Sequence, residues 1–574
     1  MSLLLLMGGS APNVASLFAN NEPGLALDVE AAYLRGWTYQ DSAGATVAAA
    51  AGDPIGLILD TAKGGLDQLG SDLVTNGTFA ADSDWTKGAN WTIGSGVATK
   101  TGGAANNLTQ TISSTAGLWY RITMDVTRTA GTLTVSLGTS GTTYAITATG
   151  TYTFFILAGS STQTLTLAGD SSFAGTVDNV TAKLVPGNHA YTTVSGSRPA
   201  LARTPDGGRR NILTYSEDLT NAVWTLTAAT VSQNSTTAPD GTSTADKLIA
   251  TAVSSGHGIR IGPVLSSTVT FTASFYAKAS EYTKCGFREG QSTGAYASFD
   301  LSNGTVIDQG TGGTGSITSV GNGWYRCSVS FTAGVTARVD LFPLPDSYTT
   351  GRPDNAYTGD GTSGVFFWGV QIEQGTLSAY QKVGLTSDVT ESGKRDCWGL
   401  LFDGSDDSLQ TASVDFSATD KMTVMAGVRK SSDAARGTVC ELTATIASNN
   451  GGFHLTAPNA ASDTFAFESK GTSLTDAVAS SIAAPATRVL VGIGNIAGDS
   501  TSLRVNGAVS DTDTGDQGTG NYANAVVYIG SRAGTSLRFN GILYTLIIRG
   551  ATTPTGTIAD FEKNLLARRC GVTF

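Results

Sequence analysis

Two short stretches of the chain place a tryptophan and an arginine two residues apart in an alternating run. They read LWYRITMDV at 118–126 and GWYRCSVSF at 323–331. Side chains alternate along a β-strand, so each tryptophan shares one face with its arginine. An indole stacks on the apolar face of a sugar ring, and a guanidinium donates paired hydrogen bonds to hydroxyls or carboxylates. Trp119, Arg121, Trp324 and Arg326 are therefore candidate ligand-binding residues.

The other faces of the same two runs predict the core. Apolar residues alternate with the tryptophans and arginines, so these side chains are expected to face inward: Tyr120, Ile122, Met124, Val126, Tyr325, Cys327, Val329 and Phe331. An outward tryptophan beside an arginine is also typical of an interface, where both types are enriched. The alternative to sugar binding is thus a face covered by an outer domain or a neighbouring chain, and for each residue taken singly packing is favoured.

Three carboxylates form a second cluster, in DGSDDS, where Asp403, Asp406 and Asp407 stand close together. Close carboxylates serve glycosidases or hold Ca²⁺. The simpler interpretation, which we favour, is a turn at the start of a strand in which Asp and Ser bond their own backbone. The only histidines, His189, His257 and His454, have no metal-ligand spacing or nucleophile motif around them.

Composition excludes several classes of function. The 574 residues carry a net charge of −11 and no block of Lys and Arg, so the basic footprint of a nucleic-acid-binding protein is missing. No apolar run approaches the length of a membrane span. The five cysteines are widely spaced and odd in number, which argues against a zinc site or a disulfide framework and predicts buried thiols.

The first residues, MSLLLLMGGSAPN, imitate a signal peptide poorly, since they carry no positive charge before the apolar run. We expect Ser2–Met7 to be buried against a partner chain or another part of this chain. Region 1–38 as a whole is interpreted as a segment for virion attachment or oligomerisation.

Short Thr-, Ser- and Val-rich runs cut by glycine predict an all-β chain. Two stretches, 73–185 and 211–375, both open with an Asn-led turn and a tryptophan, contain Trp-Tyr-Arg and close on an alternating strand, which predicts a repeated sandwich-sized module. In a third region, LRVNG and LRFNG predict hairpin turns. The final TGTIADFEKNLLARRCGVTF predicts one short helix with Ile558, Phe561, Leu565 and Leu566 on one stripe and Gly571 as its cap.

The third region resembles the concanavalin A-like (laminin-G-like) sandwiches of bacteriophage virion proteins. The residues that carry the resemblance are LLFDGSDDSLQT, LRVNG, VVYIGSRAGTSLRFNGILYTLIIRGA and the final helix, with YQDSAGATVAAAAGDPIGLILDTAKGG and GNHA…SRPAL upstream. The two repeated stretches are similar to carbohydrate-binding jelly rolls of phage tail fibres and spikes. The implied fold class is all-β: two jelly rolls inserted into a discontinuous concanavalin A-like sandwich, with one short C-terminal helix.

The resemblance implies specific boundaries. The concanavalin A-like domain would comprise 39–70, 187–210 and 386–574, with jelly rolls at 71–186 and 211–385. Related jelly rolls often place a structural Ca²⁺ where the two ends of the module meet, which makes Asn76 and Asp178 candidate ligands of the one cofactor considered. The glycosidases of this sandwich type carry Glu-x-Asp-x-x-Glu on a strand, and the chain has no such string.

The function implied is that of a non-enzymatic virion protein on the exposed surface of tail or head. It would be a receptor-binding or tail-fibre component that recognises host cell-surface polysaccharide, forms a homotrimer and contacts other virion proteins through its N-terminal segment, without binding nucleic acid or inserting into membranes. The alternatives are a head-fibre or capsid-decoration protein and, from the enzyme class, a polysaccharide depolymerase.

Overall fold

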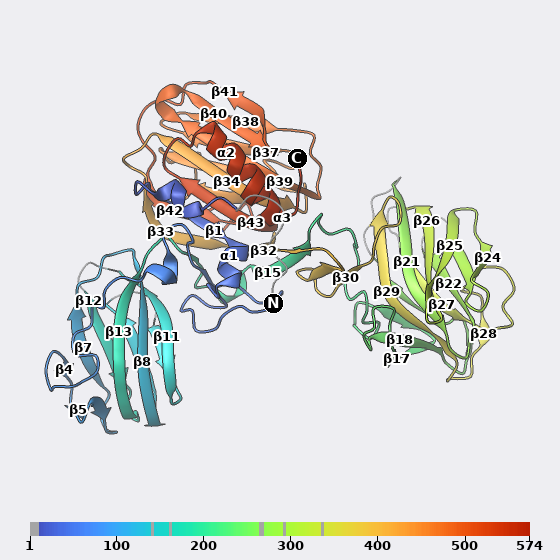
Figure 1. Ribbon diagram of the computed structural model, residues 1–574, viewed down its shortest axis with the longest axis horizontal. Helices are drawn as coiled ribbons and strands as arrows, with labels where there is room; N and C mark the ends of the chain where they lie inside the picture. Colours follow the sequence, from blue (N-terminus) through green and yellow to red (C-terminus); the bar gives the residue numbers. More distant parts are fainter. Residues whose placement is uncertain (1–10, 139–142, 160–162, 263–268, 291–293, 334–337) are drawn as a thin grey trace. The chain divides into compact units, whose positions relative to one another are not determined.

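The structure is a computed structural model that describes residues 11–138, 143–159, 163–262, 269–290, 294–333 and 338–574 (Figure 1). The expected segment Ser2–Met7 lies outside the described residues. The chain divides into two compact units, the first formed by 1–202 with 397–574 and the second by Arg203–Asp396. Among the described residues, none of the helices has the length and apolar character needed to cross a membrane.

Two antiparallel sheets face each other in the first unit and enclose its largest core. The eight-stranded sheet contains β1 (Gly24–Asp28), β15 (Ala200–Pro205), β32 (Asp396–Asp403), β34 (Lys421–Lys430), β39 (Ala486–Asn495), β40 (Ser500–Val505), β41 (Ala508–Asp513) and β43 (Asn540–Arg549). The nine-stranded sheet contains β2 (Thr38–Tyr39), β3 (Leu57–Ile58), β14 (Ala190–Tyr191), β33 (Leu409–Asp415), β35 (Thr438–Leu442), β36 (Gly452–Thr456), β37 (Phe465–Lys470), β38 (Leu474–Ala479) and β42 (Asn524–Ile529).

The C-terminal helix covers the outer face of the eight-stranded sheet, as Figure 1 shows for α2 and α3. It runs as α2 (Thr555–Phe561), a π-helical turn (Glu562–Leu566) and α3 (Ala567–Cys570), and Gly571 ends it with a left-handed φ of 68°. The predicted stripe is confirmed, because Ile558, Phe561, Leu565 and Leu566 all pack into one buried cluster on this face. This covering explains why β34 is buried on both faces: Val424 faces the sandwich core, while Met425 faces the helix.

The described part of region 1–38 does not stand apart from the sandwich, which corrects the expected boundary. The five residues of β1 pair antiparallel along β43, from Gly24 opposite Arg549 to Asp28 opposite Thr545. The short helix α1 (Val29–Leu34) follows directly. Arg569 of α3 then pairs with Asp28 and Glu30, at 2.8 Å in each case. Both ends of the described chain therefore belong to the same sheet and its covering helix.

The separated sequence pieces of the sandwich meet around a buried carboxylate. Asp60 accepts backbone hydrogen bonds from Ala26, Ala62 and Asn188 at 2.7–2.9 Å. Burial raises the pKa of Asp60 to about 6 and lowers the pKa of the neighbouring His189 to about 4. His189 Nδ1 accepts the Asp60 amide at 2.9 Å. LILDTAKGG and GNHA thus supply the two sides of one polar junction.

The first jelly roll lies in the first unit between β3 and β14. One five-stranded sheet contains β4 (Thr86–Lys87), β7 (Asn106–Ile112), β9 (Leu133–Leu137), β10 (Thr143–Ile146) and β12 (Gln163–Gly169). The other contains β5 (Trp91–Gly94), β6 (Val97–Lys100), β8 (Trp119–Ala130), β11 (Gly150–Leu157) and β13 (Ala174–Val185). Trp85 and Trp91 are buried in the core between the sheets.

The second unit is a jelly roll with two six-stranded sheets. One contains β16 (Thr225–Thr227), β20 (Gly258–Ile261), β22 (Lys284–Glu289), β23 (Tyr296–Asp300), β24 (Thr305–Gln309) and β27 (Val339–Leu344). The other contains β17 (Ala229–Thr236), β18 (Ala245–Ala250), β21 (Thr270–Ala279), β25 (Gly313–Gly321), β26 (Trp324–Thr332) and β29 (Gly364–Gln374). Two short ladders complete it: β19 (Ser254–Ser255) with β28 (Tyr357–Thr358), and β30 (Gln381–Val383) with β31 (Val389–Glu391).

Three local expectations are settled by the structure. All five cysteines are buried free thiols, as expected, and burial together with the adjacent Cys285 raises the pKa of Cys327. Asn506 and Gly507 both have positive φ and form the predicted turn between β40 and β41. The second Asn-Gly prediction is wrong: Asn540 and Gly541 begin β43, where a Cβ at Gly541 would lie 2.0 Å from the Arg429 carbonyl oxygen.

Candidate functional site

Trp119 is buried between the first jelly roll and the concanavalin A-like sandwich. Its side chain is only 1% exposed and belongs to the sandwich core. The indole meets Tyr191 edge-on, with ring centroids 5.0 Å apart, and lies 6.3 Å from the ring of His189. Tyr120, the next residue, faces the jelly-roll core, so the predicted alternation is right. The outward face is nevertheless covered by another domain.

Trp324 is equally buried, on the outer face of its sheet in the second unit. It is 1% exposed and packs with Trp368, Ala238 and Ala245. Its Nε1–H donates to the Thr237 carbonyl at 3.1 Å. Neither indole has a free face on which a sugar ring could stack, so the prediction of sugar stacking at Trp119 and Trp324 is wrong. The alternative of a face covered by the outer domain describes Trp119, whereas Trp324 is covered by residues of its own module.

The two arginines accompany the tryptophans as packing residues. Arg121 and Arg326 are half-buried, and each has a buried Nε without a hydrogen-bond partner among the described residues. Arg326 donates to the Ser274 hydroxyl at 3.1 Å and lies over the Tyr276 ring, 5.5 Å from its centroid. These contacts fix the arginine on its own sheet.

The ends of the first jelly roll do meet, near the predicted calcium ligands. Gly77 accepts a hydrogen bond from the Val180 amide at 2.9 Å. The Asn76 side chain donates to the carbonyls of Ala81 and Ser83 at 2.7 and 3.0 Å, and Asp178 accepts from the amide of Asn179 at 2.7 Å. The Asn76 amide therefore holds its own turn together.

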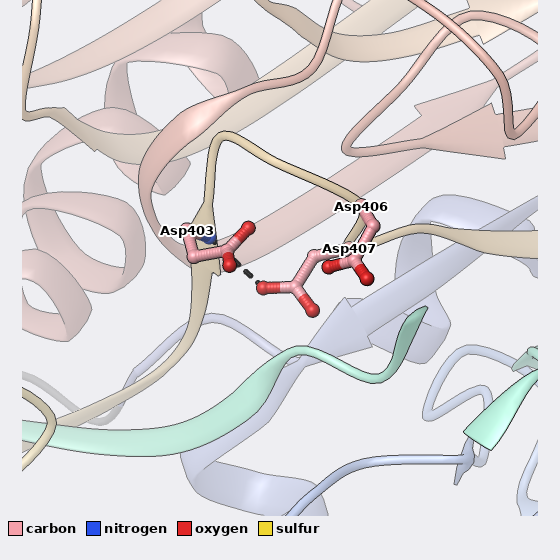
Figure 2. A group of neighbouring side chains, drawn as sticks. All are labelled: Asp403, Asp406 and Asp407. Atoms are coloured by element: carbon pink, nitrogen blue, oxygen red, sulfur yellow. Dashed lines mark hydrogen bonds between the residues drawn. The ribbon is translucent and has the colours of Figure 1, made fainter. Parts of the chain in front are cut away.

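The carboxylates of Asp403, Asp406 and Asp407 gather where β32 leads into β33 (Figure 2). One oxygen from each lies within 4.8 Å of the others. The Asp407 carboxylate accepts the Asp403 amide at 2.9 Å, and Asp403 accepts the Ser405 amide at 2.7 Å. Arg538 donates to the carbonyls of Asp406 and Asp407 at 2.7 and 3.1 Å. These are the contacts of a turn at the start of a strand.

Asp407 has the most perturbed carboxyl of this cluster. Burial, followed by the charges of Asp403 and Asp406, raises its pKa to about 7. An unfolded aspartate titrates near 3.9, so the folded protein holds an extra proton between roughly pH 4 and 7. The contribution of this group to stability is therefore complete below about pH 4 and is lost as the pH rises to about 7.

Replacing Asp407 by asparagine is expected to remove that loss. The free energy of unfolding of Asp407→Asn minus that of the wild type should be larger at pH 8 than at pH 5. We expect this increase to be about 1–2 kcal/mol after allowance for solvent screening. Urea unfolding at the two pH values measures the difference. The exposed Asp516→Asn serves as control, and an equal effect of Asp407→Asn at both pH values would contradict the assignment.

A row of polar residues crosses the outer face of the nine-stranded sheet. Strand register places directly opposite one another Gln410, Tyr528, Glu441, His454, Glu468 and Asp476. The residues that alternate with them, such as Val527 and Phe453, lie in the sandwich core. This polar row faces away from the core over six strands, β33, β42 and β35–β38.

The middle of the polar row is buried beneath two arginines. Glu441 and His454 are fully buried, and Arg532 binds both oxygens of Glu441 at 2.9 and 3.0 Å. His454 Nδ1 lies 2.8 Å from Glu468, which Arg436 also binds at 2.6 Å. Although burial opposes ionisation, His454 and Arg436 hold the pKa of Glu468 below its usual value.

An open groove of about 550 Å³ adjoins the polar row at Tyr528. The residues lining it include Thr443, Ser448, Asn449, Asn450, Asn524 and Tyr528, and none of the described residues around it is charged. The β-branched Thr443 has a φ of 79°, a conformation that costs free energy. Its buried hydroxyl has no hydrogen-bond partner within the described ranges. Strain and an unsatisfied hydroxyl thus coincide in the wall of the groove.

Sequence reasoning missed this groove and the polar row. The available signal was the Glu or His inside each of the apolar strands VCELT (439–443), GFHLT (452–456) and FAFES (465–469). Each such residue marks the outward face of a half-buried strand. His454 itself showed no neighbouring motif, because its partners come from other strands.

Comparison with known proteins agrees with this architecture. Residues 403–551 match the family model described as the concanavalin A-like lectin/glucanases superfamily. The match covers the polar row and the groove, and it identifies the carboxyl-terminal part of the first unit as a concanavalin A-like domain. Among curated proteins, none matches the chain in sequence.

Several solved structures are similar over a sandwich-sized part of the chain. The CBM40 of Ruminococcus gnavus IT-sialidase, bound to α2,3-sialyllactose, is 15% identical, with 25% of this chain and 81% of that chain covered and a TM-score of 0.21. The binding domain of botulinum neurotoxin serotype D is 12% identical, with 29% and 41% covered and a TM-score of 0.23. The binding domain of botulinum neurotoxin serotype G is 10% identical, with 33% of this chain and 48% of that chain covered and a TM-score of 0.23.

Proposed function

We propose that this chain is a surface protein of a bacteriophage virion, a receptor-binding or tail-fibre component, and that it recognises host-surface glycan through the groove beside Tyr528. The virion assignment is supported by the resemblance of the sequence motifs. The glycan assignment is supported by one observation above the others: a neutral, polar groove whose wall holds the strained Thr443 with its unsatisfied hydroxyl.

The chemistry of the groove suits an uncharged sugar. Asparagine side chains offer both donors and acceptors, which is what a ring of hydroxyl groups requires. Tyr528 adds an aromatic face and a hydroxyl. The Thr443 hydroxyl is buried behind this wall, so the contacts to a sugar would come from the asparagines and Tyr528. Assembly into a homotrimer would add weak contacts by avidity.

Removing groove side chains is expected to weaken binding of neutral oligosaccharides. Tyr528→Ala and the exposed Asn524→Ala should each lower affinity about tenfold, since one aromatic or hydrogen-bonding contact is worth about 1.4 kcal/mol. Titration calorimetry with a panel of neutral host oligosaccharides measures this. Tyr152→Ala, which removes a half-buried tyrosine of the first jelly roll, is the matched control and should bind normally.

Three further measurements separate the alternatives. A receptor-binding protein, added free and purified, should block phage adsorption to host cells, and no block at saturation would contradict that role. A head-fibre or decoration protein would appear at head positions on labelled particles. A depolymerase would release reducing ends from host polysaccharide, and we propose that this chain releases none.

A further inference from the structure

The second unit contains a cavity of about 230 Å³ on the outer face of one of its sheets. Strand register places Arg260 of β20, Asp340 of β27 and Arg288 of β22 directly opposite one another. Their chain neighbours Ile259, Leu341 and Phe287 are core residues, so the charged row faces away from the core. All residues of this cavity lie within Arg203–Asp396.

The lining of this arginine pocket carries excess positive charge in a chain whose net charge is −11. Arg260, Arg288 and Arg338 line it together with two carboxylates, Asp340 and Asp354, and the buried Glu289 lies beside Arg338. Arg338 binds Asp340 at 2.7 and 2.9 Å. Arg288 binds Asp340 at 2.6 Å and also pairs with Asp354. Asp354 is also bound by Arg352 at 3.0 Å, so both carboxylates of the lining are already shared between other guanidinium groups.

Arg260 carries the third guanidinium group, and no carboxylate of the lining pairs with it. Within 203–396, apart from the undescribed 263–268, 291–293 and 334–337, it has no ion-pair or hydrogen-bond partner, although it is half-buried. The Nε of Arg288 is also buried without a partner in the described residues. A planar guanidinium held at a cavity wall is suited to bind a carboxylate through two parallel hydrogen bonds.

The floor of the pocket is apolar and flat. Phe342 is 6% exposed, and the guanidinium of Arg288 lies 5.8 Å from the centroid of its ring. A Cβ at Gly258 would stand 2.8 Å from the Phe342 ring, so glycine keeps the backbone close to the ring. Thr227 and Ser255 add hydroxyl groups to the lining. The volume is smaller than that of pockets for drug-sized ligands, about 300–1,000 Å³, and suits a single sugar ring.

We propose that this pocket binds the carboxylate of an acidic sugar, with Arg260 as the residue that recognises the charge. The carboxylate takes the unpaired Arg260, the sugar ring lies over Gly258 and Phe342, and ring hydroxyls reach the lining hydroxyls and Asp354. The groove beside Tyr528 is neutral and the arginine pocket is cationic, so the two sites select different sugars. This inference does not depend on the function proposed for the groove.

The test uses the full chain and two probes, trigalacturonic acid and its methyl ester, in which a methyl group on each carboxyl removes the charge. Calorimetry should show the acid bound at least tenfold more tightly than the ester, with affinity falling as salt rises. Arg260→Gln should weaken binding of the acid about tenfold or more, because the variant loses the charge and the paired hydrogen bonds to the carboxylate. Lys278→Gln removes the same charge from the other sheet and should bind as the wild type does.

Three results would overturn the proposal: equal affinity for acid and ester, an unchanged affinity of Arg260→Gln, or displacement of the trisaccharide by inorganic sulfate at comparable affinity, which would make the pocket a general anion site. Arg260→Lys provides a second variant should Arg260→Gln fail to fold, since it keeps the charge and loses the paired donors, and it should show an intermediate loss. Tyr528→Ala should leave binding of the acid unchanged, so failure of the groove and failure of the arginine pocket are distinguishable.

Discussion

Replacing Trp324 by alanine is expected to lower the stability of the second unit by about 3–5 kcal/mol, the usual cost of removing a large buried aromatic side chain. The indole is 1% exposed among Trp368, Ala238 and Ala245, so its loss leaves a cavity on a face that no sheet closes. Hydrogen exchange of peptides from β18, β26 and β29 in the full chain measures the effect locally. Unchanged exchange together with lost glycan binding would instead make this face a ligand site.

The corresponding phenylalanine variants provide a sharper comparison. The Trp324 Nε1–H is paired with the Thr237 carbonyl, whereas the buried Nε1 of Trp119 has no partner in the part of the chain that the structure describes. Trp324→Phe leaves a carbonyl unpaired, and Trp119→Phe removes an unsatisfied donor. The first variant should therefore lose about 1 kcal/mol more stability than the second. The reverse order would contradict the hydrogen bonding described for the two indoles.

Replacing Arg532 by methionine is expected to destabilise the first unit by about 3–5 kcal/mol, because it leaves the fully buried Glu441 charged and uncompensated. The double variant Glu441→Gln with Arg532→Met should recover most of this loss, since the buried charge at position 441 is removed together with its partner. Urea unfolding, with hydrogen exchange of β35 and β42, measures both variants.

An exposed ion pair of the same unit provides the control for Arg532. Arg35 pairs with Asp67 at 3.3 Å, but their side chains are 48% and 68% exposed. Arg35→Met should cost less than about 1 kcal/mol. If Arg532→Met lowered the free energy of unfolding no more than Arg35→Met does, the ion pair between Arg532 and Glu441 would not be what compensates the buried Glu441 charge.

Local patterns in the sequence predicted much of the fold. Alternation gave the inward faces of the two Trp-Tyr-Arg strands, and the helical stripe gave the packing of Phe561 and Leu565. Such patterns record which face of an element is apolar. They do not record what covers the opposite face, and at Trp119 that cover comes from Tyr191, more than seventy residues away.

The two Trp-Tyr-Arg strands also occupy different places in their sheets. β8 pairs with the closing strand β13 of its module, whereas β26 pairs with β21 and β25 and has no ladder with the closing strand β29. The two sheets can be compared by counting from their closing strands, β13 and β29. The strand next to β13 is β8 and the one next to β29 is β21; the strands one place further out are β11 and β26. A shared tripeptide on half-buried strands therefore does not establish equivalent positions, because many registers satisfy the same alternation.

The polar row and the arginine pocket needed strand register, which no short window of sequence contains. Gln410 meets Tyr528, and Arg260 meets Asp340, only after strands far apart in the chain have paired. Glu441 and His454 looked unremarkable as single residues. Their significance depends on being opposite each other and beneath Arg532.

The pairing of β1 with β43 sets the order in which the chain can fold during synthesis. The ladder partner of β1 ends at Arg549, so the apolar segment GLALD has no partner strand while about 520 further residues are added. At about 5–20 residues per second, this wait is on the order of half a minute to two minutes. The second unit is continuous from Arg203 to Asp396 and can fold within that interval. The second unit is therefore able to fold while the chain is still attached to the ribosome, before the first unit can close.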